Sequence, residues 1–272
     1  MQLSINHRTH YLYTDVVNYT IQQLRLTPQD GFGQRVKRWE IRVNGHLQRH
    51  DDAHGNAAHI LVLDTPHEEI NIIATGEVET GLDTPPLDDT LPRGIYLRAT
   101  DLTYVDAGLR QFAEQYRRET IDEDSLEALM FGIVDRVPYL KGVTAVNTNA
   151  AEAFQAGKGV CQDHAHIFIA CCRQLGVPAR YVSGYLFTND GSLLESHAWA
   201  DAWLPEVGWA SFDVSNRCRT NGVHVRLATG LDYRDACPVS GMRVGGGLET
   251  MSVGVHVDQL HSRQSQSSQA QQ

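Results

Sequence analysis

The stretch GVCQDHAHIFIACCRQLGVPARYVSGY, residues 159–185, holds three of the five cysteines and joins a helical pattern to a strand pattern. Glycines at 157 and 159 let the chain turn sharply into Cys161, which opens an apolar run with helical spacing. Because apolar residues cover most of that run, we expect a central, buried helix. A thiol in its first turn meets unpaired backbone N–H groups and the positive end of the helix dipole, which favour the thiolate. The pattern therefore indicates that Cys161 is a nucleophile.

The other chemistry-bearing residues of this helix have simpler interpretations. Cys171 and Cys172 lie in mid-helix, away from the dipole end, and are expected to fill the core. His164 and His166 are two positions apart and so point to different faces, which disfavours a metal site. Asp163 is expected to act as a helix-start carboxylate.

A base and an orienting carboxylate follow in ESHAWADAW (195–203) and GWASFDV (208–214). Alternation places His197 and Trp199 on one face of the first strand and Asp213 on one face of the second. A loop over 204–208 would pair 199 with 213, which makes His197 the diagonal neighbour of Asp213. A slip of one residue would put the two side chains on opposite faces. Either residue alone is more simply a structural one, but a helix-start cysteine beside them favours a nucleophile with its base and orienter.

Composition narrows the class of protein. The 272 residues are 42% hydrophobic and 21% charged, as in ordinary globular proteins, with a formal net charge of −10. No basic patch stands out, so nucleic acid is not expected as a partner. There is no apolar run of membrane-spanning length and no signal-peptide pattern at the N-terminus, so we expect neither a membrane partner nor export. An odd cysteine count with an adjacent pair suits free thiols, and a cytoplasmic location is expected.

The chain is expected to have α+β architecture with two domains. Short alternating runs within residues 1–82 predict an N-terminal antiparallel β-sandwich. Residues 83–94, rich in proline and aspartate, are expected to form a linker. Residues 95–260, with helices followed by strands, are expected to form the catalytic domain. Residues 261–272 are polar and low in complexity, so we expect a disordered tail.

Four histidines cluster in the N-terminal region, at positions 46, 50, 54 and 59. They are candidates for a metal site, but solvated histidines in turns are the simpler interpretation. No metal and no other cofactor is therefore expected.

Three segments together resemble the core of the transglutaminase-like superfamily, which is related to papain-type cysteine peptidases. They are GVCQDHAH, LGVPARYVSGY and HAWADAWLPEVGWASFDVSN. The N-terminal region resembles the β-domain that precedes this core in bacterial transglutaminase-like proteins, and VRLATGLDYRDACPVSG fits the same group. The resemblance implies a core of helices packed on an antiparallel sheet.

By this resemblance Cys161 is the nucleophile, His197 the general base and acid, and Asp213 the residue that orients His197. The backbone N–H of Cys161 is one expected oxyanion donor. Gln155 has the spacing of the oxyanion glutamine in papain-type peptidases, although it falls in a predicted helix. Tyr233 and Asp235 are candidates for the cleft wall, and a structural role is equally open for both.

The expected function is a cysteine-dependent amide hydrolase or acyltransferase that works through a thioester acyl-enzyme. Its substrates would be peptide, protein or isopeptide amides. Family analogy favours hydrolysis over cross-linking. The alternatives are a non-catalytic peptide-binding module on the same fold and a metal-dependent hydrolase that uses some of the 13 histidines. The oligomeric state is not indicated.

Overall fold

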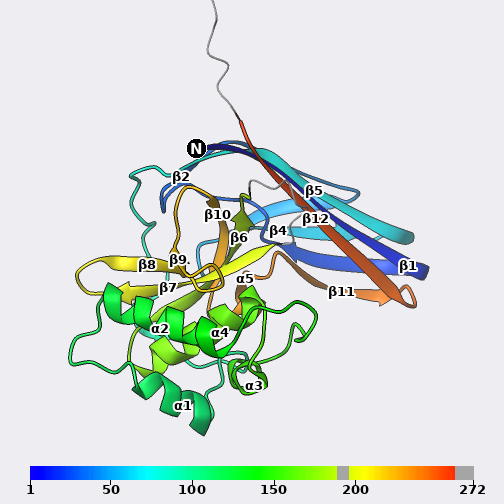
Figure 1. Ribbon diagram of the computed structural model, residues 1–272. Helices are drawn as coiled ribbons and strands as arrows, with labels where there is room; N and C mark the ends of the chain where they lie inside the picture. The colour runs from blue at the N-terminus through cyan, green and yellow to red at the C-terminus, as the bar shows by residue number, and fades with distance from the viewer. Residues whose placement is uncertain (189–195, 261–272) are drawn as a thin grey trace, which may run out of the picture.

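The computed structural model of the chain describes residues 1–188 and 196–260. The expected disordered tail, 261–272, lies outside the described residues. The described chain forms two antiparallel sheets, and Figure 1 shows the helices gathered on one side of the smaller sheet, with the larger sheet on the other side. This is the predicted α+β architecture. Within the described ranges, no helix combines the length and the apolar character that a membrane crossing requires.

Seven strands form the larger sheet, in the order β2-β5-β1-β4-β3 with β11 and β12 also paired to β1. They are β1 (Gln2–Leu24), β2 (Gln34–Val43), β3 (His46–Asp51), β4 (Ala57–Leu63), β5 (His67–Thr80), β11 (Val239–Gly245) and β12 (Glu249–Gln259). Along the first half of β1 every second side chain is buried, beginning with Leu3 and Ile5. This alternation gives the sheet one buried face, as a half-buried strand requires.

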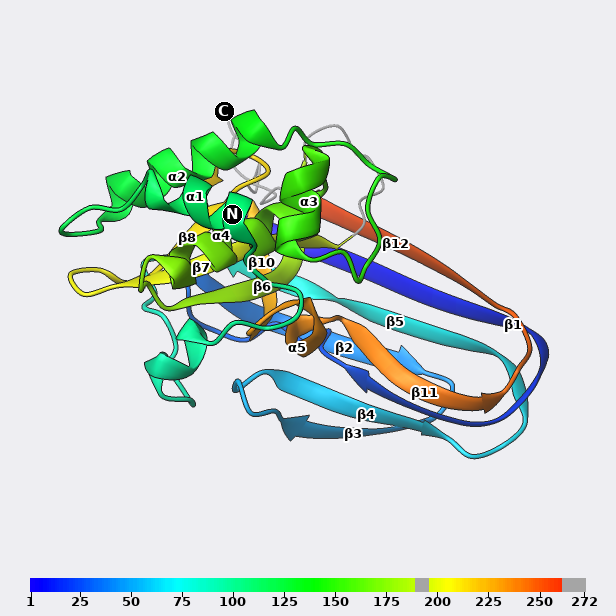
Figure 2. The same cartoon turned by 90° about the horizontal axis from the view of Figure 1, so that it is seen from below.

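The larger sheet is folded across its strands into two layers. The first half of β1 pairs with β5 and β12, and its second half pairs with β4 and β11, with register shifts between Leu12 and Val17 and again at Val17–Tyr19. Figure 2 shows β1 bending at the far end of the sheet, where β12 and β5 also give way to β11 and β4. Residues 2–24, where the sequence analysis expected several short runs, are therefore one bent strand. The expected sandwich is a single near-barrel sheet.

Residues 239–259, which the sequence analysis assigned to the catalytic domain, belong to the larger sheet instead. β11 pairs with residues 17–24 and β12 with residues 3–13, so the two strands together follow β1 along its length. The physical reason is that Val255 and Val257 complete the buried apolar core of that sheet. β11 itself was not predicted.

The smaller sheet has the order β10-β6-β7-β8-β9. Its strands are β6 (Ala179–Leu186), β7 (His197–Leu204), β8 (Gly208–Asp213), β9 (Cys218–Arg219) and β10 (His224–Gly230). The helical elements are η1 (Arg93–Leu97), α1 (Ala107–Glu114), α2 (Glu123–Arg136), α3 (Ala150–Ala156), α4 (Cys161–Gln174) and α5 (Tyr233–Ala236). α4 packs between the sheet and the other helices, and its residues from Asp163 to Arg173 are all buried. The central, buried helix predicted from the sequence is confirmed.

The two sheets share packing at their junction. Tyr185, Val225 and Leu227 of the smaller sheet lie in the apolar core of the larger one. The Tyr185 hydroxyl also hydrogen-bonds Nδ1 of His7 over 2.9 Å. The smaller sheet therefore packs against both α4 and the N-terminal sheet.

Candidate functional site

Cys161 is the first residue of α4, and Val160 is its N-cap. The side chain is partly exposed, whereas Cys171 and Cys172 on the same helix are fully buried. Burial raises the pKa of both buried thiols, so these two cysteines are core residues as predicted. Only Cys161 combines access with a place at the positive end of the helix dipole.

Asp163 holds the start of α4 in place. Its Oδ2 accepts a hydrogen bond from the backbone N–H of Val160 at 2.8 Å and one from the Thr144 hydroxyl at 2.7 Å. The first bond satisfies a donor at the helix start, and the second ties down the loop that precedes α3. Gly159 makes room, because a Cβ there would lie 2.8 Å from Cβ of Asp163. The expected helix-start carboxylate thus also positions the turn that carries Cys161.

His197 and Asp213 come together across β7 and β8. Trp203 pairs with Trp209 and Ala200 with Phe212, which is the register predicted from the alternation. Nε2 of His197 lies 2.8 Å from Oδ2 of Asp213. Cys161 is close enough to His197 to raise the pKa of the imidazole through hydrogen bonding and charge. Since Nε2 faces the carboxylate, the other ring nitrogen, Nδ1, is left for the sulfur.

The three side chains form a charged network in a mostly dry site. Burial lowers the pKa of His197, but hydrogen bonds and charges from Asp213 and Cys161 outweigh burial and raise this pKa from 6.5 to about 10. Burial raises the pKa of Asp213, yet its bonds to His197 and His224 hold that pKa below its usual value. The arrangement therefore keeps an imidazolium beside the sulfur at neutral pH, between two groups that accept its protons.

The sequence analysis missed two further partners of Asp213. His224, at the start of β10, places Nε2 2.9 Å from the same Oδ2, and its Nδ1 accepts the backbone N–H of Asn221 at 3.2 Å. Nδ1 is therefore an acceptor and Nε2 the donor, so His224 is a neutral imidazole. Asn216 donates from Nδ2 to the same carboxylate at 2.7 Å. The sequence signal for His224 was its position at the start of an alternating strand. Nothing in the sequence connected that strand with Asp213.

The same group is the candidate metal site of the described residues. His197, Asp213 and His224 offer three ligand atoms within 4.8 Å of one another. In the structure these atoms satisfy one another through the two bonds to Oδ2 of Asp213. Of the four N-terminal histidines, His54 pairs with Asp235 at 3.2 Å, and His50 lies 3.3 Å from the Gln23 amide.

Aromatic and imidazole rings line the buried side of α4. Burial lowers the pKa of His166 to about 3, so this ring is neutral; it packs 5.1 Å from Tyr181 and accepts the backbone N–H of Tyr233. Tyr181 lies between Cys161 and α5, since its ring is edge-on to Tyr233 at 6.1 Å and it interacts electrostatically with Cys161. Tyr233 is thereby connected to Cys161 through Tyr181.

The remaining two candidates lie elsewhere. Gln155 is exposed on α3, whose buried side chains, among them Ala153 and Phe154, pack toward α4. In the described ranges no recorded contact turns Gln155 toward Cys161. Asp235 accepts the backbone N–H of Leu231 and pairs with His54, so its carboxylate lies at the junction with the N-terminal sheet. The structural role left open for Asp235 is the one its contacts support.

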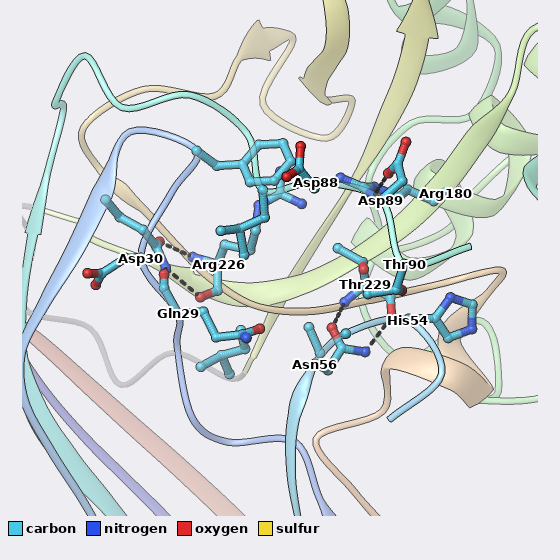
Figure 3. A pocket seen from close by; sticks show the side chains of 16 residues that line it. Gln29, Asp30, His54, Asn56, Asp88, Asp89, Thr90, Arg180, Arg226 and Thr229 are labelled. Carbon is cyan, nitrogen blue, oxygen red and sulfur yellow. Dashed lines mark hydrogen bonds and ion pairs between the residues drawn. The ribbon is translucent and has the colours of Figure 1, made fainter. Parts of the chain in front are cut away.

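Two cavities lie near the junction of the two sheets. One, of about 390 Å³, is lined by Ser196 and Tyr233, next to the His197 side of the site. The other, of about 340 Å³, is shown in Figure 3 and is lined by Arg180, Arg226 and the linker residue Asp89. Arg180 and Arg226 in the cavity of Figure 3 are both bonded to Asp201. Ser196 places the first cavity one residue from His197.

Fold and site together define an α+β protein with a partly exposed helix-start cysteine, an imidazolium and a buried carboxylate. Comparison with known proteins agrees with this class. Residues 110–214 match the transglutaminase-like superfamily, and residues 3–79 match the bacterial transglutaminase-like N-terminal region. The chain therefore has a transglutaminase-like superfamily core, preceded by a bacterial transglutaminase-like N-terminal region. The predicted family and fold are confirmed.

Individual relatives are similar over different lengths. An uncharacterized protein of Mycobacterium leprae is 26% identical over 95% of this chain and 99% of its own length. A protein-glutamine gamma-glutamyltransferase of Pseudomonas aeruginosa is 27% identical over 50% of this chain, which spans 23% of that enzyme. A solved structure from Cytophaga hutchinsonii, named "a Putative Cysteine Protease", superimposes with a TM-score of 0.78 at 24% identity, over 96% of this chain and 91% of that one. The last similarity shows a shared fold.

Proposed function

We propose that the protein is a cysteine-dependent amide hydrolase or acyltransferase. Cys161 is the nucleophile, His197 the general base and acid, and Asp213 the residue that positions His197. The observation that carries the proposal is the contact chain from the sulfur through His197 to Asp213, with 2.8 Å between Nε2 and Oδ2. An imidazolium beside a helix-start thiol favours the thiolate, which is the attacking form.

The first half-reaction forms a thioester. The Cys161 thiolate attacks the amide carbonyl carbon, a C–S bond forms, and the carbonyl electron pair moves to oxygen. As the tetrahedral intermediate collapses, the C–N bond breaks, and the leaving nitrogen takes the proton from Nδ1 of His197. The products are an acyl-enzyme, a free amine and a neutral His197 that still donates to Asp213.

The second half-reaction releases the acyl group. Nδ1 of His197 takes a proton from water, whose oxygen attacks the thioester carbonyl. The C–S bond then breaks, which gives a carboxylic acid and restores the thiolate–imidazolium pair. An amine in place of water gives a new amide by the same steps. We propose hydrolysis as the main outcome, in line with the family analogy, with peptide, protein or isopeptide amides as substrates.

Charge develops on the carbonyl oxygen in both steps. The backbone N–H of Cys161 lies in the first turn of α4, where N–H groups have no intrahelical acceptor. This N–H is the proposed oxyanion donor. Gln155 is not part of the proposed site, since its exposed side chain on α3 is not held toward the sulfur.

The proposal is tested by selective alkylation and by turnover. Wild-type protein is treated with iodoacetamide, and Cys161→Ala is assayed against a panel of peptide, glutamine and isopeptide amides. Cys218→Ala is the matched control, because Cys218 is also partly exposed but burial raises its pKa to about 11. We expect alkylation first at Cys161, turnover in C218A and none in C161A.

Two results would count against the enzyme. Equal alkylation of Cys161 and Cys218, or unchanged turnover in C161A, would remove the thiolate mechanism. An inert thiol in a protein that still binds peptides would support the alternative of a non-catalytic binding module. Loss of turnover with a chelator in metal-free buffer would instead indicate a metal at His197, Asp213 and His224.

The state of the cysteines bears on where the protein works. All five are free thiols, and free thiols persist in a reducing compartment, so we propose the cytoplasm as the location.

A further inference from the structure

A groove runs between the two layers of the larger sheet. Two adjoining cavities, of about 390 and about 350 Å³, share Tyr11 and Val239 as lining residues. The first is also lined by Ser196 and Tyr233, and the second extends to Arg243 and Glu249. We refer to the pair as the interlayer groove. It extends from the inner face of β1 to Ser196, the residue before His197.

One end of the interlayer groove adjoins the proposed active site. Ser196 directly precedes His197 in the chain. Tyr233 packs edge-on against Tyr181, which in turn interacts electrostatically with Cys161. A molecule bound in this groove would therefore extend from the side of the site where His197 lies.

The floor of the interlayer groove is polar although it belongs to a sheet core. His7, Thr9, Thr20 and Gln22 are all buried on the inner face of β1. Most of them have partners, such as the 2.8 Å bond between Nε2 of His7 and the Thr9 hydroxyl. Gln22 is 6% exposed, and its Oε1 has no hydrogen-bond partner in the described part of the chain. Buried polar atoms are rarely left unpaired, so Oε1 is an acceptor that an N–H of a ligand would satisfy.

One wall of the interlayer groove is a strand edge. The second cavity touches every residue from Val239 to Arg243, although successive side chains of a strand point to opposite faces. A cavity that meets all five must contact the backbone of β11. Over residues 1–188 and 196–260, β11 pairs with β1 alone, which leaves its outer edge free. A free edge beside a cleft suits the addition of an extended peptide as a further strand.

The charges of the interlayer groove balance. Arg243 pairs with Glu249 at 3.2 Å and stacks over the Tyr13 ring at 4.9 Å. The rest of the lining is aromatic, apolar or neutral polar, including Tyr11, Met251 and Val253. Such a surface suits the backbone and mixed side chains of a polypeptide better than a phosphate or a polyamine.

We propose that the interlayer groove binds an extended polypeptide segment of the substrate. The segment lies along the edge of β11, donates an N–H to Oε1 of Gln22, and presents an amide near its other end to Cys161. Five residues of extended chain span about 17 Å. The groove would therefore contact several substrate residues beyond the amide bond that reacts. The inference rests on the proposed function for what happens at Cys161, but the binding itself does not require turnover.

The test measures binding in the full-length Cys161→Ala protein, which cannot turn over a bound peptide. The probe is a mixture of N-acetylated dodecapeptide amides randomised at every position, and retained peptide is quantified after filtration. Val253→Trp fills the groove from β12. Ser252→Trp is the matched control, because Ser252 is the preceding residue of β12 and its side chain is exposed.

We expect C161A and S252W/C161A to retain the peptides equally, and V253W/C161A to retain at least tenfold less. Met251→Trp, at a position that lines the groove but is already 55% exposed, replaces V253W if that variant does not fold. Equal retention by the filled and control variants, or no retention by any of them, overturns the proposal. An inert Cys161 in the wild type would contradict the amide chemistry alone and would leave this binding result to stand by itself.

Discussion

The carboxylate of Asp213 accepts hydrogen bonds from two imidazoles that have different protonation states. His197 faces the sulfur with its second nitrogen, whereas Nδ1 of His224 is occupied by the backbone N–H of Asn221. Both rings meet Oδ2, at 2.8 and 2.9 Å. One imidazole is therefore charged and able to move a proton, and the other is a fixed neutral donor. This difference follows from the partner of the second ring nitrogen, not from residue type.

The first prediction concerns the charge on His197. Its pKa is raised to about 10, so the imidazolium, and the stability it contributes, is present at neutral pH and is lost as pH rises through that value. We expect iodoacetamide to alkylate Cys161 about tenfold faster in wild type than in His197→Asn at pH 7, because the imidazolium favours the thiolate. This advantage should shrink as pH rises toward 10 and His197 loses its proton. A wild-type profile identical to that of H197N would contradict the ion pair.

The second prediction concerns His224 as a positioning residue. His224→Ala leaves the buried Asp213 carboxylate with one donor fewer, and the hydrogen bond it removes is worth roughly 2 kcal/mol. We expect kcat to fall roughly tenfold with little change in KM, because His197 is less firmly oriented while the substrate contacts remain. His224→Gln, which retains a side-chain N–H donor, should recover most of kcat. If H224Q behaves like H224A in kcat while both fold normally, a role through this hydrogen bond is excluded.

At this scale the sequence predicted the three central residues and missed their supports. Cys161, His197 and Asp213 each stand out through local pattern, either a helix start or strand alternation. His224 and Asn216 meet Asp213 only because β10 and the turn after β8 converge there. Such contacts depend on where the chain runs after β8 and on which strand β10 pairs with, and local sequence patterns do not report either. Gln155 illustrates the reverse, since its spacing matched a family motif while the local chain formed a helix that points it to solvent.

The start of α4 depends on a carboxylate that serves two donors. Both bonds to Asp163 end on Oδ2, so an asparagine oxygen in the same place can accept both. Burial raises the pKa of Asp163, so stability is lost as pH rises from the ordinary carboxyl pKa to that raised value, and it stays lower above it. The side chain is needed as an acceptor more than as a charge.

A third prediction follows for this helix start. Asp163→Ala should lower the free energy of unfolding by about 1–2 kcal/mol and slow alkylation of Cys161, because the turn before α4 loosens. Asp163→Asn should be at least as stable as wild type at pH 7. Asp122→Ala is the control, since Asp122 accepts the Ser125 N–H at the start of α2, away from the nucleophile. Urea unfolding and alkylation rates measure both effects. Equal slowing of alkylation in D122A would show a general loss of stability instead.

The element boundaries near the site were the most predictable part of the fold. The helix over 150–156 has Asn149 as its N-cap and Gly157, in the left-handed conformation, as its C-cap, which are the residue types preferred at these positions. The register of β7 against β8 followed from alternation and a short loop. These features are local, and a periodic pattern of side chains reports them directly. The bend within β1 is different, because residues 14–18 carry no proline or glycine to mark it.

At the scale of the whole molecule, the pairing of strands far apart in the chain determines the domain organisation, and the sequence does not show that pairing. β12 pairs with residues 3–13 at the opposite end of the chain, and the alternation of β12 alone does not name its partner. The division at residue 82 therefore separates segments that fold together, since residues 239–259 close the N-terminal sheet. The 83–94 segment is likewise attached, because Asp89 accepts from Nε1 of Trp209 at 2.7 Å.

A fourth prediction concerns the buried ions at the junction of the two sheets. Asp201 is fully buried and bonds Arg180 at 2.9 Å and Arg226 at 2.8 Å. Asp201→Asn leaves two buried guanidinium groups without a full countercharge, which should cost about 3 kcal/mol at pH 7. Burial raises the pKa of Asp201, but the two arginines outweigh it and lower that pKa to about 2. The stability it gives is present above about pH 4 and is lost as pH falls toward 2, so D201N should flatten the acid side of the stability curve. Asp89→Asn, at a more exposed position, should have a smaller effect; an equal loss would contradict this account.

The last prediction is that the two sheets unfold as one unit. Tyr185, Val225 and Leu227 of the smaller sheet lie in the core of the larger one, so neither sheet keeps its buried surface if the other opens. Trp39 is on β2, whereas Trp199, Trp203 and Trp209 are on the smaller sheet. In Trp39→Phe, fluorescence therefore reports the smaller sheet, while far-ultraviolet circular dichroism reports all strands. We expect the same urea midpoint by both methods, and loss of cooperative unfolding by both when the chain is ended after residue 238, because β1 then loses β11 and β12 along its length. Two separated midpoints in W39F, or a cooperative fluorescence transition in the shortened chain, would show that the smaller sheet and its helices fold independently.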